Sequence, residues 1–390
     1  MQRVKANIHL DNIRKNAEAF SALSGVKLCA VVKADAYGHG AEAVTMTLSG
    51  VADVFAVALI EEALAIRIAA CGKEILVFTP PITEEECYTL AVNGFTASVD
   101  SLKTARLLCR ICKKYRIAIN VHLKVNTGMN RYGMNVQTLG KVCKLLQTNR
   151  YVKPQGIYSH LYTCGLRQAE EQRRIFVRMV AVGKGYFPNL IAHLGATYGA
   201  LLGEEYSFDM VRVGLGLYGY LPCEANGKTG VFADTIDRLN LQKGMTVYAK
   251  AVAGRKYVFG GLGYGEEPNG REIDRLTVLR VGYADGFLRT RENGMDGWQE
   301  NANNLCMDAC IRFGEWKVGQ WLPILTDAER TAQETGTIAY EVLCAAGRRA
   351  ERIYDDETAF CRRGNIDFAK GEKGASTRVY EKQTDGKYQP

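Results

Sequence analysis

One lysine stands between a continuous apolar run and a group of small residues, an arrangement that suits covalent chemistry at an amine. The segment reads Ala30-Val31-Val32-Lys33-Ala34-Asp35-Ala36-Tyr37-Gly38-His39-Gly40. Burial disfavours the ammonium form, so a lysine that leaves a buried strand has a lowered pKa and can form a Schiff base. The glycines that follow let the backbone approach an anionic ligand closely. An exposed lysine at a strand end is the alternative interpretation.

Four other reactive side chains occupy similar places in the pattern. Lys124, His160, His193 and Arg212 each stand at or near the end of a short apolar, β-branched run. The carboxyl ends of barrel strands form the rim on which active sites are built. For either histidine taken singly, a hydrogen-bonded core residue is the alternative. Together with Lys33, the four residues predict a catalytic rim.

The elements that position these residues are eight short apolar runs, separated by stretches with helical periodicity such as residues 60–70 and 101–115. Alternating strands and helices predict a parallel β/α fold, and eight strands close a (β/α)8 barrel of the TIM type. An open doubly wound sheet is the structural alternative. The predicted strands are Lys27–Val32, Val54–Leu59, Ile75–Phe78, Phe95–Val99, Ile117–Val125, Gly156–His160, Leu190–Leu194 and Val211–Leu217.

After about residue 235 the pattern changes to short strand-like runs with glycine turns. We therefore predict a barrel domain at 10–234 and a mainly β domain at 235–355, which the N-terminal strand at 1–9 joins. The polar segment 356–390 has too little apolar surface to fold and is expected to be a flexible tail. The strands expected in the second domain are Val4–Leu10, Thr246–Val252, Leu276–Val281, Trp321–Leu325 and Tyr340–Leu343.

Composition argues against nucleic-acid and membrane partners. Of the net charge of +8, the last thirty residues account for seven Lys/Arg against four Asp/Glu, and the other basic residues form no stripe with aromatics. No run approaches the roughly 18 apolar residues of a membrane helix, and the N-terminus lacks a signal peptide. We therefore expect a cytoplasmic protein that binds neither a membrane nor nucleic acid.

The twelve cysteines are expected to be reduced, and most of them to be packing residues. Cys109 and Cys112 have the spacing of half a zinc site, but they fall in a helical stretch without a second pair of ligands. No metal is expected.

Six segments, in one order along the chain, resemble motifs of the alanine racemase family. The resemblance reaches about residue 354, and six motifs in order are far more specific than any one of them. The resemblance implies an enzyme that uses pyridoxal 5'-phosphate (PLP) and consists of a barrel and a β domain. It also implies a small amino-acid substrate and a homodimer with shared active sites. The segments are Val31–Gly40, His122–Met134, Met210–Gly219, Gly263–Gly265, Val281–Phe287 and Cys306–Asp308.

The resemblance also implies two catalytic bases. Lys33 carries the cofactor and acts on one face of the substrate Cα, while Tyr264 of the partner subunit acts on the other. Two opposed bases are needed because a single base would return the proton to the face it left. Arg212 hydrogen-bonds the pyridine nitrogen, and because arginine does not give up its proton, it keeps the ring a weak electron sink and disfavours transamination.

The remaining roles are carried over from the family in the same way. Arg131 and the backbone N–H of Met307 would bind the substrate carboxylate. Lys124, Tyr283 and Asp308 are supporting residues, with His193 extending the hydrogen-bond network toward Arg212 and His160 extending it toward Tyr264. The groups that contact the cofactor are Lys33, Tyr37, His160, Thr197, Arg212, Gly214, Leu215 and Tyr340.

Three features depart from the family pattern or stay open. Asn126 stands where an acidic residue is usual, and Ala196-Thr197 replaces the commoner Asn-Ser before the phosphate site. The second domain is expected to be shortened around residues 326–337. Lys124 is either carboxylated, as in the family, or an ordinary ammonium.

The first hypothesis is an alanine racemase that supplies D-alanine for peptidoglycan of the bacterial cell wall. A serine or broad-specificity racemase is the nearest alternative, and only substrate kinetics separates the two. A non-catalytic PLP-binding barrel is a different class, but such proteins lack the β domain and its Tyr264. A PLP decarboxylase of the same general fold needs no opposed tyrosine.

Overall fold

Eight parallel strands form the first part of the molecule, and each overlaps one of the apolar runs predicted from the sequence. The computed structural model describes residues 4–222, 233–264, 274–288 and 305–355. The predicted tail at 356–390 lies outside the described residues. The strands are β2 (Lys27–Val31), β3 (Val54–Val57), β4 (Glu74–Val77), β5 (Thr96–Val99), β6 (Ile119–Lys124), β7 (Val152–Tyr158), β8 (Ile191–His193) and β9 (Met210–Val213).

The strands follow the order β8-β7-β6-β5-β4-β3-β2-β9, so the last strand pairs with the first. Between β8 and β9 the ring is joined by single contacts: Arg212 N–H donates to Gly195 O at 3.0 Å, and Asp209 N–H donates to Ala192 O at 2.9 Å. The result is a nearly closed parallel barrel, which confirms the predicted fold. The doubly wound alternative is wrong.

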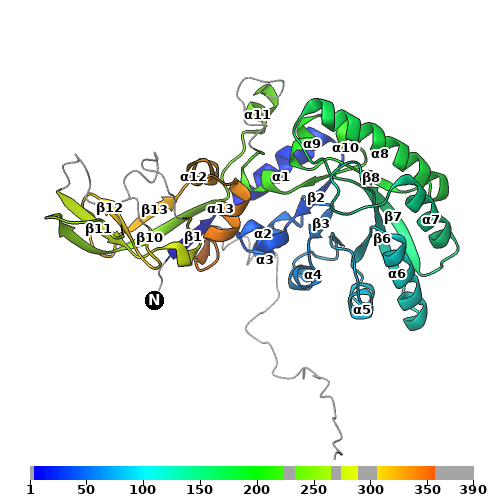
Figure 1. Ribbon diagram of the computed structural model, residues 1–390, viewed down its shortest axis with the longest axis horizontal. Coiled ribbons are helices and arrows are strands. Elements are labelled where there is room, and N and C mark those ends of the chain that lie inside the picture. Colours follow the sequence, from blue (N-terminus) through cyan, green and yellow to red (C-terminus); the bar gives the residue numbers. More distant parts are fainter. Residues whose placement is uncertain (1–3, 223–232, 265–273, 289–304, 356–390) are drawn as a thin grey trace, which may run out of the picture.

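Helices cover the outside of the barrel (Figure 1). Several begin at residues that cap them: the side chains of Thr83, Ser101 and Asn135 each accept the backbone N–H three residues further on. The helix predicted at 60–70 ends at Ile66. The helices are α1 (Leu10–Ser24), α2 (Lys33–Tyr37), α3 (Ala41–Leu48), α4 (Ile60–Ile66), α5 (Glu84–Val92), α6 (Leu102–Tyr115), α7 (Val136–Gln147), α8 (Leu166–Tyr186), α9 (Thr197–Leu201), α10 (Glu204–Ser207) and the 3₁₀ helix η1 (Leu215–Tyr218).

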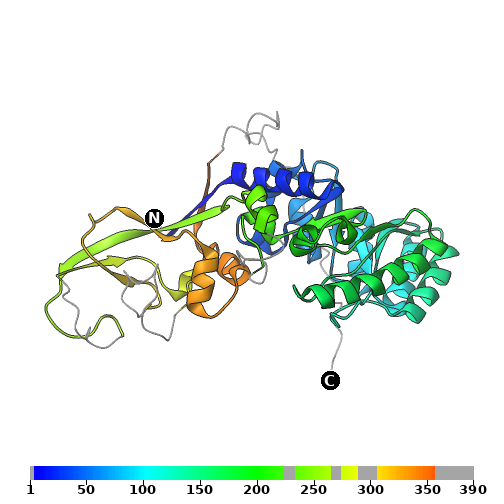
Figure 2. The same cartoon turned by 90° about the horizontal axis from the view of Figure 1, so that it is seen from above.

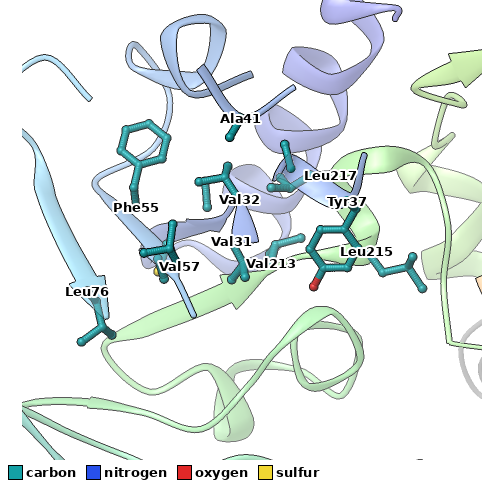
Figure 3. Packing of buried hydrophobic residues seen from close by; sticks show 14 of the residues in the cluster. Val31, Val32, Tyr37, Ala41, Phe55, Val57, Leu76, Val213, Leu215 and Leu217 are labelled. Atoms are coloured by element: carbon teal, nitrogen blue, oxygen red, sulfur yellow. The ribbon is translucent and has the colours of Figure 1, made fainter. Parts of the chain in front are cut away.

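The barrel strands are buried because helices cover their outer faces and side chains fill the interior. Every residue of β3, β5 and β9 is buried, as in parallel sheets covered on both sides. Figure 3 shows this packing around β2, where Val31 and Val32 lie close to side chains of β3 and β9. The apolar runs therefore form a rigid base for the polar residues at their ends.

Cys109 and Cys112 lie in α6 with their side chains buried. Burial raises the pKa of each thiol to about 11, so both are protonated packing residues at neutral pH. Among the described residues, no group of three or more His, Cys, Asp or Glu side chains is arranged to hold a metal ion.

The second domain is built on a sheet with the strand order β12-β11-β10-β1-β14, with β13 paired to β10. β1 pairs antiparallel with β10 and parallel with β14, which confirms that the N-terminal strand joins this domain. The elements are β1 (Val4–Ile8), α11 (Ala233–Leu239), β10 (Met245–Lys256), β11 (Arg275–Leu279), η3 (Tyr283–Asp285), β12 (Cys310–Phe313), β13 (Trp321–Leu325), α12 (Ala328–Thr335), α13 (Ala339–Ala346) and β14 (Glu351–Tyr354).

The strand predicted at Tyr340–Leu343 is wrong, because these residues belong to the helix α13. Its buried residues recur with helical spacing, and its composition is rich in alanine. A short apolar run cannot by itself distinguish a buried strand from a buried helix. The buried residues of α13 are Ala339, Val342, Leu343 and Ala346.

The second domain extends away from the barrel (Figures 1 and 2). β10 begins beside the barrel, where Gly244 N–H donates to Tyr218 O at 3.1 Å, and it runs to the far end of the domain, where it pairs with β11. α13 lies at the near end against α2, so closely that a Cβ at Gly38 would be 2.5 Å from Leu343 O. In the described part of the chain, no helix is both long enough and apolar enough to cross a membrane.

Candidate active site

The lysine segment is α2, a short turn directly after β2 whose backbone is left-handed. Lys33 is followed by residues 34–37, which all have φ between 52° and 53°. Non-glycine residues lose about 1–2 kcal/mol each in this left-handed conformation, so neighbouring contacts must hold the turn in place. The turn places Lys33 at the carboxyl end of the first barrel strand.

Contacts from the barrel and from the second domain hold this turn. The Glu62 carboxylate accepts the Ala34 N–H at 2.7 Å. From β14, the Arg352 guanidinium forms an ion pair with Asp35 at 2.5 Å and donates its Nε–H to Gly38 O at 2.9 Å. The strained turn is therefore fastened on two sides within one chain.

Lys33 is half-buried at the rim. Desolvation, and secondarily the positive charge of Arg131, lowers the pKa of its amine. A lowered pKa favours the neutral amine, which is the nucleophilic form. The segment meets the chemical requirement predicted for it from the sequence.

A set of hydroxyl and backbone N–H groups converges beyond the ends of β8 and β9. Thr197 Oγ1 accepts the N–H groups of Gly214 and Gly216 at 3.3 and 3.2 Å. A Cβ at Gly214 would lie 2.6 Å from the Tyr37 hydroxyl, so that hydroxyl approaches the backbone just before Leu215. Two hydroxyls and the first N–H groups of a helical turn suit a phosphate, and this is the usual phosphate position in such barrels.

Tyr340 reaches the same region from α13 of the second domain. Its ring centroid lies 5.9 Å from that of Tyr37, which in turn lies 4.9 Å from Tyr218. Burial raises the pKa of Tyr37 and of Tyr218, so both hydroxyls stay protonated and can donate hydrogen bonds. The predicted phosphate residues therefore do come together, and Thr197 retains the hydroxyl that the usual serine would supply.

Arg212 is buried in the barrel and held by its terminal nitrogens. One donates to His193 O at 2.9 Å and to His193 Nδ1 at 3.0 Å, and the other donates to Ser159 O at 2.7 Å, Leu194 O at 3.0 Å and His160 Nδ1 at 3.3 Å. The Nε–H hydrogen-bonds to none of the described residues. Burial lowers the pKa of Arg212 to about 10, which leaves the guanidinium charged at neutral pH.

Lys124 ends β6 and is buried, with its Nζ 4.8 Å from the centroid of the Tyr158 ring. Desolvation, followed by the charges of Arg212 and Arg131, lowers its pKa well below the usual value. None of the carboxylates in the described part of the chain lies within ion-pair distance of the amine. The neutral form of Lys124 is therefore more accessible than that of an exposed lysine.

The turn between Lys124 and Arg131 is shaped by Asn126. Its Oδ1 accepts the N–H groups of Gly128 and Asn130 at 3.0 and 3.1 Å. An aspartate would accept the same bonds, so the departure from the family pattern keeps the shape of the turn and removes one negative charge. Arg131 follows this turn in an exposed position.

The other predicted residues lie on the second domain, where two of its loops form one unit. Tyr283 N–H donates to Cys306 O and Ala284 N–H donates to Met307 O, both at 3.0 Å. Arg349 lies between the two loops, 3.5 Å from Asp285 and 3.8 Å from Asp308.

This second group is exposed and separate from the rim of its own chain. Tyr264 is 77% exposed, Met307 55% and Tyr283 42%. None of the three makes a hydrogen bond, ion pair or ring contact with a described residue of the barrel rim. The structure thus assembles the barrel half of the predicted site, and it leaves the second half on a surface.

Sequence reasoning missed four residues that support the site. Glu62 and Arg352 hold the lysine turn, and no pattern in the sequence links either to residues far away in the chain. His122 and Glu74 lie behind Arg212. For His122, a polar residue between the apolar Val121 and Leu123 was an available signal.

The comparisons with known proteins agree along nearly the whole chain. Residues 8–222 match the family model "Alanine racemase, N-terminal domain" and residues 245–354 match "Alanine racemase, C-terminal domain". The chain is 30% identical to alanine racemase of Synechocystis sp., over 90% of this chain and 100% of that protein.

Solved structures give the same result. Alanine racemase of Clostridium difficile 630 superposes with a TM-score of 0.78 at 27% identity, covering 91% of this chain and 96% of that one. Alanine racemase of Bartonella henselae with covalently bound pyridoxal phosphate has the same fold, with a TM-score of 0.76 at 24% identity over 91% and 99% of the two chains.

Proposed function

The chain belongs to the alanine racemase family, and we propose that it interconverts L- and D-alanine with PLP held covalently on Lys33. One observation carries the proposal: a lysine whose pKa is lowered, a set of phosphate donors and a buried guanidinium share one barrel rim. When bound, PLP withdraws electrons from the substrate Cα and so makes its proton removable.

The residues of the rim fit PLP. Tyr37, Thr197 and the N–H groups of Gly214 and Leu215 would hold the phosphate, and Tyr340 would complete that contact from α13. The free Nε–H of Arg212 would donate to the pyridine nitrogen. Because Arg212 stays charged, it cannot pass a proton to the ring, and a ring left unprotonated favours return of the proton to Cα over transamination.

Two side chains then move the proton. The Lys33 amine takes or returns it on one face of Cα, and the Tyr264 hydroxyl does so on the other. His160, held at its Nδ1 by Arg212, would extend the network toward Tyr264. The substrate carboxylate would be bound by the Arg131 guanidinium and by the Met307 N–H.

Sharing of the site between two subunits is supported by the position of its second half. Tyr264, Tyr283 and Met307 are exposed on the second domain. A base must act in a site that excludes water, so a second subunit would have to cover these residues with its barrel rim. A symmetric homodimer makes this contact twice. In the shared site of this dimer, Tyr264 and Tyr283 would leave room only for a substrate with a small side chain.

Carboxylation of Lys124 is supported by its environment. The reaction with CO2 requires a neutral amine, and burial favours that form here. The resulting carbamate would place a negative charge close to Arg131 and Arg212. Position 126, where an acidic residue is usual in the family, is an asparagine here and supplies no such charge. An intact-protein mass under native conditions should show an added CO2 that Lys124→Ala removes, and a mass unaffected by the substitution would contradict carboxylation.

The proposed function is tested by chiral analysis of products from a panel of L-amino acids. We expect D-alanine from L-alanine, with faster turnover of alanine than of serine. Faster turnover of serine would make the protein a serine or broad-specificity racemase. Release of CO2 would indicate a decarboxylase. A PLP-loaded protein that forms no product from any substrate would contradict the proposal.

A further inference from the structure

A line of polar groups runs through the barrel interior behind Arg212, from two buried histidines to the partly exposed Glu74. His193 ends β8, His122 stands in the middle of β6, and Glu74 begins β4. β4 and β6 are not neighbours in the barrel, so the contact between Glu74 and His122 crosses its interior. The line connects the catalytic rim to the opposite end of the barrel, where the strands begin.

The backbone makes room for the middle of this line. Gly156 of β7 faces the His122 ring, and a Cβ there would lie 2.7 Å from its Cε1. Real Cβ atoms do not approach so closely, so an imidazole at 122 requires glycine at 156. The ring is 1% exposed. It is therefore a tightly enclosed polar group, and its hydrogen bonds must be made inside the barrel.

The donors along the line can be assigned in one direction. A guanidinium only donates, so His193 Nδ1 accepts from Arg212 at 3.0 Å. A neutral His193 then carries its hydrogen on Nε2 and donates it to His122 Nδ1 at 2.9 Å. His122 in turn carries its hydrogen on Nε2, which lies 3.4 Å from Glu74 Oε1.

Both rings are neutral, because burial lowers the pKa of His122 to about 4 and that of His193 well below its usual value. Glu74 Oε1 and His122 Nε2 are both buried, and neither makes a hydrogen bond with a described residue, so each faces the other at 3.4 Å as its nearest partner of opposite type. The carboxylate is therefore placed to act as the acceptor at the end of the line, and a small rotation of either side chain completes that hydrogen bond.

We propose that Glu74 is a positioning residue that sets the tautomers of His122 and His193 and thereby keeps Arg212 oriented for its role at the rim. The orientation of Arg212 has a meaning for catalysis only if the proposed racemase function holds, but the tautomers do not depend on that function.

The consequence of losing Glu74 follows from the same donor assignment. Without an acceptor at 74, a His122 Nε2–H is buried and unpaired, which favours the tautomer with hydrogen on Nδ1. That hydrogen faces His193 Nε2, which must then accept it. His193 consequently carries its own hydrogen on Nδ1, against the Arg212 donor. The lost bond loosens the guanidinium at the rim.

The test compares Glu74→Met, which removes the acceptor, with Glu74→Gln, which keeps an acceptor oxygen. Lys27→Met is the control, since Lys27 is an exposed residue at the start of β2. The protein has five histidines, so ¹⁵N-histidine spectra of the cofactor-free and PLP-loaded forms can be assigned by single substitutions. Glu74→Ala replaces the Met variant if bulk prevents folding.

We expect His122 and His193 to show the Nε2–H tautomer in the wild type, in Glu74→Gln and in Lys27→Met, and to lose it in Glu74→Met. In the racemase assay, kcat of Glu74→Met should fall about fivefold with little change in KM, which corresponds to one hydrogen bond. Unchanged tautomers in a folded Glu74→Met protein would overturn the proposal. Altered tautomers in a protein without racemase activity would instead contradict the proposed function.

Discussion

The two halves of the predicted site differ in how complete they are within one chain. On the barrel, Arg212 and Thr197 are each 3% exposed and held in place by hydrogen bonds, whereas Tyr264 on the second domain is 77% exposed. The barrel half is preorganised before any partner arrives. The second half consists of side chains exposed on a surface, which the proposed homodimer would bring into a site that excludes water.

The second domain nevertheless contributes to the barrel half of its own chain. Arg352 fastens the lysine turn, and Tyr340 lies beside Tyr37. The near end of the domain thus contributes to the proposed cofactor site in its own subunit, while its loops would complete the proposed site of the other subunit. Mutations in the two halves should therefore have different effects.

The largest effect is expected from Lys33→Ala in the barrel half. Loss of the amine removes both the attachment point and one base, so racemisation should fall by at least about a thousandfold. Borohydride reduction of the wild type should fix the cofactor on the peptide that contains Lys33. A colourless protein that stays unlabelled with added PLP would contradict this assignment, and Lys27→Ala at the other end of β2 is the control.

Tyr264→Phe tests the second half alone. One proton transfer is lost, so kcat should fall roughly 10²- to 10⁴-fold while the affinity for PLP stays unchanged. In D2O, one enantiomer of alanine should still exchange its α-hydrogen without inversion, through Lys33. If both enantiomers exchange at equal rates, the tyrosine is not the second base.

The sequence singled out these two residues as candidates because both lie in motifs, and it predicted the eight strands, which the structure confirms, from buried β-branched runs. Other features could not be predicted. Residues 34–37 carry no glycine to indicate a left-handed turn, and the turn is held by contacts from Glu62 and Arg352. Distant contacts of this kind have no local pattern, and the helix α13 was mistaken for a strand because its apolar run is short.

Arg352→Met should have an intermediate effect and tests whether the second domain supports the barrel in its own chain. Without the guanidinium the left-handed turn loses two contacts, and we expect PLP to bind roughly tenfold more weakly, the loss of one charged hydrogen bond. Equilibrium titration with PLP measures this, and Arg348→Met is an exposed control nearby. Equal affinities for both variants would show that the turn needs no support from β14.

The smallest effect is expected on the stability of the barrel when the pH is lowered. Burial lowers the pKa of His39 and of His122 to about 4 in the folded barrel, below the value of about 6.5 expected in the unfolded chain. The unfolded state therefore binds more protons below pH 6.5, and barrel stability should fall as the pH drops toward 4.

Two spectroscopic probes report on the two domains separately. Tryptophan fluorescence reports on the second domain, because all the tryptophans lie beyond residue 290, and far-ultraviolet circular dichroism reports mainly on the barrel, because most helices surround it. Between pH 7 and 5, the urea midpoint from far-ultraviolet circular dichroism should fall by at least about 0.5 M more than the midpoint from tryptophan fluorescence. Coincident curves at every pH would mean that the two regions respond to acid as one unit.

The shared site is tested most directly by mixing Lys33→Ala and Tyr264→Ala proteins under conditions that let subunits exchange. Each protein alone should be nearly inactive. In a mixed dimer one site receives both defects and the other receives neither, so equal amounts that reassort at random should recover roughly a quarter of wild-type activity. If subunits demonstrably exchange and the mixture stays as inactive as its components, both bases come from one chain and the shared site is refuted.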